Sequence, residues 1–403
     1  MIMAIDNKEK VLNVPNLRFP EFTGEWKLHA TTDYFEFKNG LNPEAKRFGL
    51  GTKFISVMDI LNNRYITYDK VIASVLPKDD DLKEFGVNYG DILFQRSSET
   101  LEDVGRANVY LDDKTALFGG FVIRGKKIGN YNPLFFRYLL SSPNARKSII
   151  VKGAGAQHFN ISQDGLSKVL LNVPSIQEQE KISQFINYID ERIDTQSKII
   201  EKLESLIKGI CNKLLFADNG KPVRLIDILT ERTEKTKENN QHEVLSSTVK
   251  GIFSQREYFS KDIASENNIG YKIIRLYDIV LSPQNLWMGN INYNEKFKIG
   301  IVSPSYKIFS IKAEFDKRFV AFILKTHRAL YNYMLVSEQG ASVVRRNLNM
   351  EAFEQLVFKM PPYDKQREIG KTLSFLQSRL ELETEIKSDY EQQKKYLLTE
   401  MFI

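Results

Sequence analysis

Apolar residues recur with helical spacing in two long stretches of the chain, residues 174–216 and 361–403. Both stretches alternate steps of four and three residues, a pattern that predicts a coiled-coil seam because one narrow face of the helix packs against another helix. In the first stretch the seam positions are Ile182, Ile186, Ile189, Ile193, Gln196, Ile200, Leu203, Ile207, Ile210 and Leu214. In the second they are Ile369, Leu373, Leu376, Leu380, Glu383, Lys387, Tyr390, Lys394, Leu397 and Met401.

The two stretches are copies of one another at a constant offset of 187 residues. Pro174 falls on Pro361, Gln179 on Gln366 and Arg192 on Arg379 without a gap. Because this period is far longer than that of a solenoid, it predicts a duplicated unit made of a globular domain followed by a long helix. Each helix would be about 60 Å long, and we expect the two to pair antiparallel about an approximate two-fold axis, with one globular domain at each end.

The segments outside the helices alternate short apolar runs with Gly, Asn and Asp, a pattern typical of strands. Predicted strands include residues 54–58, 90–94 and 121–123, and residues 277–281 match 90–94 at the same offset. Residues 133–140 predict a short helix. We therefore expect an α+β fold of two mixed α/β domains joined and spaced by two long antiparallel coiled-coil helices. The predicted segments are an N-terminal strap (1–24), a first domain (25–172), a central helix (173–216), a second domain (217–359) and a C-terminal helix (360–403).

Composition narrows the functional classes only slightly. The 403 residues suffice for two or three domains, and a net charge of +6 permits nucleic-acid binding without requiring it. The single cysteine, Cys211, excludes an intramolecular disulfide. The sequence contains no run of 18 apolar residues and therefore predicts no membrane span. The polar N-terminus has no signal-peptide pattern. We expect a cytoplasmic protein that does not bind membranes.

Motifs for catalysis are weak or incomplete. Pro361-Pro362-Tyr363 resembles the catalytic loop of adenine methyltransferases, but Met360 stands where that loop needs Asp or Asn. Gly153-Ala-Gly155 does not follow a long strand or open a helix, so it does not predict a cofactor loop. The four histidines lie far apart in the sequence, which argues against a metal site. We predict neither a catalytic site nor a metal site in this chain.

Polar and basic residues follow the matching strands of both copies. Amide, guanidinium and hydroxyl groups are the side chains that bind base edges and phosphates. Each loop alone is compatible with an ordinary surface, but recurrence at matching places in both copies favours DNA binding. The predicted DNA-binding residues are Lys53, Gln95, Arg96, Ser97, Ser98, Gln157, His158, Gln284, Asn285, Trp287, Arg345 and Arg346.

The chain resembles, over essentially its whole length, the specificity subunit of type I restriction-modification systems. The order domain, long helix, domain, long helix is itself distinctive. The second copy departs from the family's pattern at Lys365-Gln366 and at Arg345-Arg346 before Asn347. The resemblance rests on Val14-Pro-Asn-Leu-Arg-Phe-Pro-Glu-Phe22, Gly90-Asp-Ile-Leu-Phe94, Tyr277-Asp-Ile-Val-Leu281, Asn160-Ile-Ser162, and Val173-Pro174 followed by Glu178-Gln179 and Ile182.

This resemblance implies a function without catalysis in the chain itself. Each globular domain would recognise one half of a split double-stranded DNA target through the major groove, and the helices would set the gap between the half-sites. The helices would also dock two modification subunits that hold S-adenosylmethionine and methylate adenine. Restriction subunits would add ATP- and magnesium-dependent translocation and cleavage.

Two alternatives remain open at the level of sequence. A coiled-coil protein scaffold that does not recognise DNA would explain the helices but not the matching polar loops. A degenerate DNA methyltransferase-like protein would explain the Pro361-Pro362-Tyr363 segment, although a complete catalytic loop and a cofactor loop are absent from the sequence.

Overall fold

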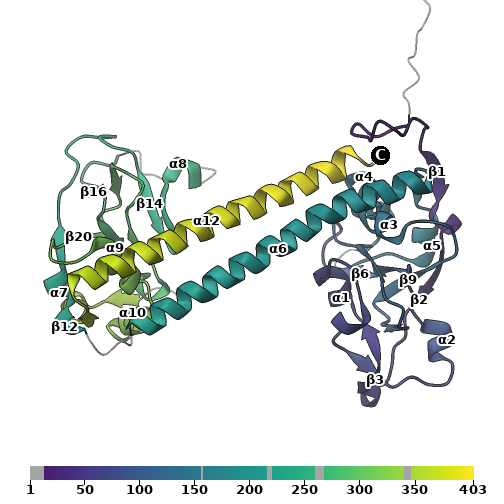
Figure 1. The fold of residues 1–403 in the computed structure, drawn as a ribbon, viewed down its shortest axis with the longest axis horizontal. Coiled ribbons are helices and arrows are strands. Elements are labelled where there is room, and N and C mark those ends of the chain that lie inside the picture. The colour runs from purple at the N-terminus through teal and green to yellow at the C-terminus, as the bar shows by residue number, and fades with distance from the viewer. Residues whose placement is uncertain (1–12, 156–157, 216–219, 259–266, 340–345) are drawn as a thin grey trace, which may run out of the picture. The chain divides into compact units, whose positions relative to one another are not determined.

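The computed structural model describes residues 13–155, 158–215, 220–258, 267–339 and 346–403. The chain forms two compact units, which we call unit 1 (Met1–Ser197 with Glu385–Ile403) and unit 2 (Lys198–Thr384) (Figure 1). Two long helices, α6 (Ile176–Leu215) and α12 (Tyr363–Glu400), each contribute residues to both units. The compact units therefore do not end where the predicted helical segments begin, because each unit holds one domain together with part of both helices.

Unit 1 is built around a four-stranded antiparallel sheet in the order β2-β9-β5-β7. A second sheet has the order β4-β3-β8, and the pairs β1-β11 and β6-β10 complete the strands. The strands are β1 (Lys27–Ala30), β2 (Phe35–Asn39), β3 (Phe48–Ile55), β4 (Ser74–Val75), β5 (Ile92–Gln95), β6 (Ser97–Ser98), β7 (Ala107–Val109), β8 (Leu117–Phe118), β9 (Val122–Lys127), β10 (Phe159–Asn160) and β11 (Leu170–Val173). The short helices are α1 (Val57–Asn62), α2 (Asp81–Phe85), α3 (Pro133–Leu139), α4 (Pro143–Ile150) and α5 (Gln163–Ser167).

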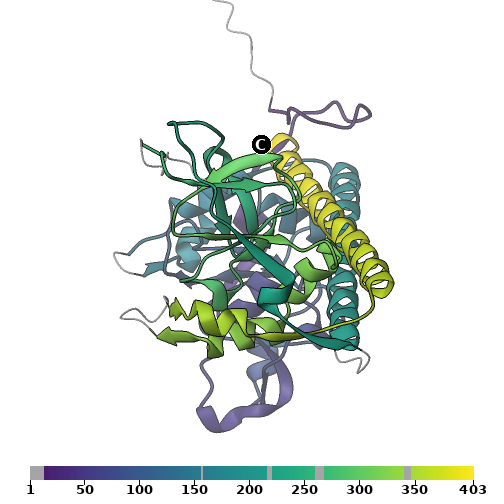
Figure 2. The same cartoon turned by 90° about the vertical axis from the view of Figure 1, so that its left-hand side faces the viewer.

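Unit 2, which faces the viewer in Figure 2, repeats this plan with the sheet order β13-β20-β17-β18. The pair β12-β23 corresponds to β1-β11. The strands are β12 (Lys221–Arg224), β13 (Leu229–Arg232), β14 (Leu245–Thr248), β15 (Gly251–Ser254), β16 (Lys272–Arg275), β17 (Ile279–Leu281), β18 (Ile291–Tyr293), β19 (Ile299–Val302), β20 (Lys307–Ile311), β21 (Ser337–Gln339), β22 (Arg346–Leu348) and β23 (Val357–Met360). The short helices are α7 (Leu225–Ile228), α8 (Gln255–Tyr258), α9 (Lys317–Leu324), α10 (His327–Leu335), α11 (Met350–Glu354) and the 3-10 turn η4 (Leu286–Met288).

The start of each long helix is joined to its own domain by a glutamine. The Gln179 amide donates to the Pro174 carbonyl at 3.0 Å and accepts from the Asn132 N–H at 3.0 Å. Gln366 makes the same pair of bonds, to the Pro361 carbonyl at 2.8 Å and from the Asp316 N–H at 3.0 Å. Asn132 and Asp316 cap α3 and α9. The repeated Pro and Gln of the sequence therefore fix the direction in which each long helix leaves its domain.

Glu178 lies three residues after Ser175, the spacing of a capping box, but its carboxylate has other partners. Ser175 Oγ accepts the Glu178 N–H at 3.4 Å, as a helix cap does. The Glu178 carboxylate, however, binds the Arg18 guanidinium through two bonds of 2.7 Å and the Trp26 indole N–H at 3.1 Å. Unit 2 has Lys365 at the matching position, where it pairs with Glu368 at 2.7 Å. The N-terminal strap thus binds Glu178 through Arg18, and the second copy has no acid at that position. Residues 1–12 of the strap lie outside the described part.

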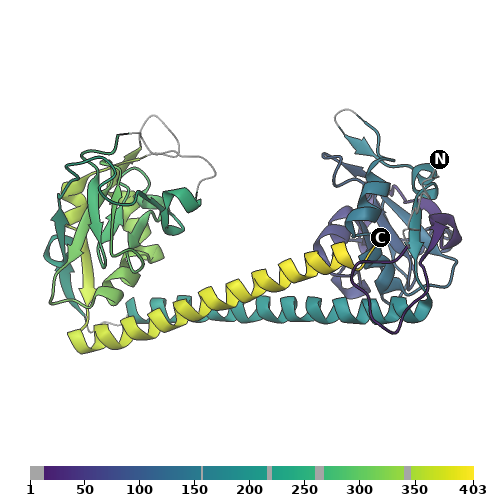
Figure 3. The same ribbon diagram turned by 90° about the horizontal axis from the view of Figure 1, so that it is seen from above.

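The predicted seam packs against its domain as well as against a helix. Ile182, Ile186 and Ile189 are buried in the main core of unit 1, together with Leu397 and Phe402 near the end of α12. Figure 3 shows these last turns of α12 (yellow) beside the first turns of α6 (teal). Elsewhere along the seam, Leu373 is buried and the following residues are half-buried: Ile193, Ile200, Leu203, Ile369, Leu376 and Leu380. The interpretation that the stripe packs only on another helix is therefore incomplete.

The predicted strand at residues 54–58 is wrong in its second half. β3 ends at Ile55, and Ser56 is the N-cap of helix α1. The Asp59 carboxylate accepts the Ser56 N–H at 2.7 Å and its hydroxyl at 2.7 Å. This capping box ends the strand inside an apolar run, because it satisfies the free N–H groups of the new helix.

Candidate nucleic-acid interface

In unit 1 the structure brings together two of the polar segments singled out in the sequence. β6 pairs antiparallel with β10, with Ser97 opposite Asn160 and Ser98 opposite Phe159. The Ser97 hydroxyl also donates to the Asn160 side-chain oxygen. The exposed His158 directly precedes β10, whereas Gln157 lies outside the described residues. The result is a short polar ribbon that follows the buried strand β5.

Arg96 lies beside a turn that the sequence did not single out as a site. Its N–H donates to the Phe121 carbonyl at 2.9 Å, and its guanidinium donates to the Gly120 carbonyl at 3.2 Å. The Phe121 side chain is 70% exposed, although the sequence placed it in a strand. The Gly119-Gly120 pair was the available signal, because consecutive glycines mark a turn. An exposed aromatic ring beside Arg96 suits contact with nucleobases or sugars.

The other two predicted residues of unit 1 occupy different environments. Gln95 is buried, and its amide donates to the Ser97 carbonyl at 2.8 Å. It therefore stabilises the backbone of the ribbon. Within the described part of the chain the Gln95 Oε1 atom has no hydrogen-bond partner. Lys53 lies on β3, in the other sheet. Its connection to the ribbon is indirect: the Ile55 carbonyl accepts the Gly119 N–H, and Arg96 donates to the same turn. The structure therefore does not join Lys53 directly to the ribbon.

Unit 2 brings together the matching segments with different side chains. The Arg346 N–H donates to the carbonyl of the exposed Gln284 at 3.1 Å. The Arg346 guanidinium carbon lies 4.9 Å from the centroid of the Trp287 ring, a cation–π distance. The Asn285 side-chain oxygen is buried without a hydrogen-bond partner among the described residues. Arg345 lies outside the described residues.

The two surfaces occupy equivalent places in the duplicated fold. At the offset of 187, Ser97 falls on Gln284 and Phe159 falls on Arg346. In unit 1 this connection is the β6-β10 pair, and in unit 2 it is the Arg346-to-Gln284 hydrogen bond. The backbone plan is thus repeated, while the exposed chemistry changes from hydroxyls, histidine and phenylalanine to amide and indole, with an arginine at a different position in each surface.

A buried aspartate stands just before the strand that leads to each surface. The Asp91 carboxylate accepts the N–H groups of Asn88 at 3.0 Å and Lys127 at 2.8 Å. Asp278, its copy, accepts the Arg275 N–H at 2.9 Å and pairs with Arg232 at 3.1 Å. Burial raises the pKa of both carboxyls, against the lowering effect of these bonds. These bonds hold the starts of β5 and β17 in place.

Among the residues that the structure describes, no three His, Cys, Asp or Glu side chains gather closely enough to hold a metal ion. None of the described helices combines the length and the apolar content that crossing a bilayer requires.

Comparison with known proteins gives the family. The model of the type I restriction modification DNA specificity domain matches residues 23–205 and again residues 221–392. The chain belongs to this family. Family membership confirms the resemblance seen in the sequence, and the two matches agree with the duplication.

Relatives of this specificity-subunit family match nearly the full chain. A protein named as the type I restriction enzyme MjaX specificity subunit, from Methanocaldococcus jannaschii, is 22% identical over 96% of this chain and 95% of its own length. The crystal structure of a type I restriction-modification S subunit from M. genitalium has a TM-score of 0.60 at 15% identity and covers 97% of this chain and 99% of that one. A structure from a study of type I restriction-modification complex assembly has a TM-score of 0.51 at 11% identity, covering 93% and 96%. These structural matches confirm the predicted fold class.

A specificity subunit recognises DNA on behalf of a restriction-modification complex and is not itself the catalyst. The fold agrees with that role, since it presents two similar surfaces with different side chains.

Proposed function

We propose that this specificity subunit binds a bipartite DNA target through the two surfaces described above. The ribbon β6-β10 with the Gly119–Phe121 turn would contact one half-site, and η4 with β22 would contact the other. The observation that carries the proposal is the repetition of one backbone plan with different exposed side chains. Two domains of one fold that differ at the same surface are suited to two different sequences.

The side chains available suggest how each half-site is contacted. In unit 2, Gln284 can form paired bonds with adenine and Arg346 with guanine, whereas the side-chain oxygen of Asn285 is buried. In unit 1, the hydroxyls of Ser97 and Ser98 and the ring of His158 suit base edges or phosphates, while Arg96 suits guanine or phosphate. Lys53 and the two residues outside the described part, Gln157 and Arg345, extend the proposed surfaces.

The long helices would fix the gap between the half-sites. α6 contains 40 residues and continues from unit 1 into unit 2 without a break. At 1.5 Å per residue it is about 60 Å long, and half-sites on one face of DNA repeat about every 34 Å. We therefore expect this helix to set the separation of the half-sites.

The complex would supply the chemistry that this chain lacks. We propose that two modification subunits carrying S-adenosylmethionine dock on the helical regions, and that restriction subunits add ATP- and magnesium-dependent steps. Assembly would take place in the cytoplasm.

A methylation map would test the proposal directly. Cells expressing the modification subunit with and without this chain would be compared for adenine methylation across the genome. The expected result is a split motif with two short half-sites and a fixed gap, present only with this chain. An intact complex that binds DNA with no sequence preference and adds no methylation would contradict the proposed function.

A further inference from the structure

A buried acid joins α6, α12 and the first domain inside unit 1. The Asp190 carboxylate of α6 lies 2.6 Å from the Lys394 ammonium of α12 and accepts the Tyr138 hydroxyl of α3 at 2.8 Å. Asp190 is 4% exposed, and all three residues belong to unit 1. When a carboxylate and an ammonium leave water together, removing either one leaves the other buried and unpaired. The contact of α12 with unit 1 therefore depends on one particular lysine.

The first domain holds this acid in position. Arg64 lies 3.8 Å from the Asp190 carboxylate, pairs with Asp194 at 3.0 Å and donates to the Asn187 side chain. Arg137 in turn donates to the main-chain carbonyl of Arg64. The domain contacts one carboxylate oxygen of Asp190, Oδ2, and leaves the other, Oδ1, to the lysine of α12.

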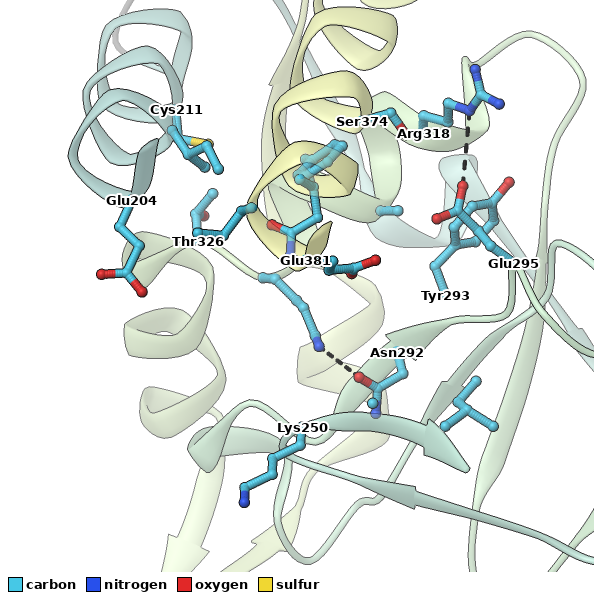
Figure 4. A pocket seen from close by; sticks show the side chains of 18 of the residues that line it. Glu204, Cys211, Lys250, Asn292, Tyr293, Glu295, Arg318, Thr326, Ser374 and Glu381 are labelled. Carbon is cyan, nitrogen blue, oxygen red and sulfur yellow. Dashed lines mark hydrogen bonds and ion pairs between the residues drawn. The ribbon is translucent and has the colours of Figure 1, made fainter. Parts of the chain in front are cut away.

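The matching positions of unit 2 carry different residues. The long helices are aligned by the offset of 187, and α3 is aligned with α9 by their caps, Asn132 and Asp316. The matched residues, unit 1 first, are Asp190 and Gln377, Lys394 and Ile207, and Tyr138 and Phe322. The three residues of unit 2 line a groove of about 540 Å³, which Figure 4 shows with Glu204 and Cys211 of α6 among its labelled side chains. An amide, an isoleucine and a phenylalanine thus replace the ion pair and its hydroxyl partner.

The duplication offers each unit two similar helix ends. Unit 1 contains the second half of α12, and unit 2 contains the second half of α6. Both halves belong to copies of one seam, so the α6 of a second copy of this chain could take the place of α12 in unit 1. Ile207 of that second copy would then stand where Lys394 stands. The spacing of the seam alone does not exclude this exchange.

The ion pair makes the exchange unfavourable for both helices. With Ile207 opposite it, Asp190 would keep its contacts to the domain but lose the ammonium that binds Oδ1. In the reverse exchange, Lys394 would enter unit 2, where Gln377 stands in place of the acid. Burial lowers the pKa of Lys394 even beside Asp190, which shows that this position disfavours an ammonium without a partner. A buried charge that loses its partner costs more than the pair gains.

We propose that the Asp190–Lys394 pair selects α12 over the α6 of a second copy, so that the chain pairs its two long helices with each other. The partner that it rejects is this same protein. A polar contact in a helix seam can fix which helices pair, at some cost in stability. The inference concerns the assembly of the chain alone and does not rest on the proposed function.

Moving the lysine between the helices tests the inference. In Lys394→Ile combined with Ile207→Lys, Asp190 finds an ammonium only on the α6 of a second copy, and two copies paired through α6 form the ion pair twice. The full chain would be studied by analytical ultracentrifugation and native mass spectrometry. Wild type is expected to be monomeric, and the exchange is expected to strengthen dimerisation about tenfold or more. Cross-linking of mixed isotope-labelled and unlabelled copies should then join two α6 helices.

A matched control separates this effect from moving a charge. Lys371 and Gln184 occupy matching positions of the two helices, and both are exposed. Lys371→Gln combined with Gln184→Lys therefore moves one lysine from α12 to α6 outside the buried cluster. This variant should remain as monomeric as wild type.

A second variant leaves unit 1 unchanged in case the exchange does not fold. Ile207→Lys combined with Gln377→Asp places the same two charges in unit 2, where they can pair within the chain. The second halves of α6 and α12 then carry the same lysine, so unit 1 no longer distinguishes them. After refolding at high concentration, this variant should contain more dimer than wild type while its melting temperature does not fall. A purely structural role of the pair would not produce that result, because no native ion pair is removed.

Two results would overturn the inference. The first is that neither the exchange nor the second variant, where folded, forms more dimer than wild type. The second is a wild-type chain that already forms dimers cross-linked through α6. Neither result bears on DNA recognition, which the methylation map tests separately.

Discussion

At the scale of single residues, we expect Arg346 to be the main DNA-binding side chain of unit 2. Its backbone is fixed to Gln284 and its guanidinium lies over Trp287. We expect Arg346→Ala in the assembled complex to weaken binding to the target about tenfold or more and to relax preference in one half-site. Arg346→Lys should lose preference while retaining more affinity, because lysine keeps the charge but not the planar, bidentate group.

Fluorescence anisotropy with targets altered in one half-site at a time measures both effects. Arg224→Ala removes an exposed arginine that pairs with Asp227 at 2.9 Å, and it serves as the control. If Arg346→Ala leaves affinity and both half-site preferences unchanged, Arg346 is not part of the DNA surface.

Asp91 predicts a pH dependence of stability that can be measured. Burial raises its pKa above the ordinary value of 3.8, so the folded chain holds this proton more tightly than the unfolded chain. Its contribution to stability is therefore fully present below about pH 4 and is lost as the pH rises through the raised value. Asp91→Asn removes the titration. We expect wild type to lose more stability than the variant as the pH rises from about 4 to about 6.

Chemical unfolding at several pH values tests this expectation. The free energy of unfolding is plotted against pH, and its slope is compared between wild type and Asp91→Asn. A constant offset between the two proteins is not informative, because asparagine also loses one acceptor oxygen. Asp113→Asn, at an exposed position, is the control. Parallel pH curves for Asp91→Asn and wild type would contradict the raised pKa.

At the scale of elements, the sequence predicted the long helices better than the domains. Seam spacing depends on neighbours a few residues away, so it identified α6 and α12 directly. The contact of Glu178 with Arg18 and Trp26 joins residues more than 150 positions apart, and no local pattern signals it. The prediction of a strand at residues 54–58 is wrong after Ile55 because Ser56 and Asp59 form a capping box inside an apolar run. Tertiary contacts and caps, not propensity, decided these cases.

The same distinction applies to the candidate site. Recurrence at the offset of 187 brought out Gln95, Arg96 and Ser97 beside His158, and Gln284 and Trp287 beside Arg346. It missed Phe121, because an aromatic residue before a buried strand looks like part of that strand. It also could not separate Gln95, which is buried beneath the ribbon, from its exposed neighbours. Whether a side chain points to the core or to the surface depends on how the turn folds, which the sequence pattern does not reveal.

The last turns of α12 are structural parts of unit 1, and this gives an element-scale prediction. Phe402 is buried, with its ring centroid 6.2 Å from that of Trp26 and 5.5 Å from that of Phe135. Phe402→Ala is expected to destabilise unit 1 by about 3 to 5 kcal/mol, the usual cost of a buried phenylalanine cavity. The chain has two tryptophans, one in each unit. In a Trp287→Phe background, Trp26 fluorescence therefore reports unit 1 alone.

Tyr396→Ala is the control for this experiment, since that ring is 59% exposed on α12, close to Phe402 in the sequence. It should change the unfolding of unit 1 by no more than about 0.5 kcal/mol. An equal effect of the two substitutions would mean that the end of α12 does not belong to the core of unit 1.

At the scale of the whole molecule, duplication has preserved the framework and changed the surfaces. The sheet order, the Pro and Gln at each helix start and the buried Asp91 and Asp278 recur in both units. The ribbon residues do not. We therefore expect what is repeated to set geometry and what differs to set which DNA half-site each unit accepts.

If the repeated helices set geometry, their length can be changed without changing recognition. Deleting residues 194–200 from α6 and the equivalent 381–387 from α12 shortens each helix by about 10 Å and keeps its apolar face nearly in register, because seven residues are close to two turns. The half-sites in the methylation map are expected to stay the same, while the gap shortens by up to about three base pairs at 3.4 Å each. Replacing those residues with seven others that preserve the seam is the control and should keep the original gap. An unchanged gap in the deletion variant, with methylation intact, would show that helix length does not set the spacing.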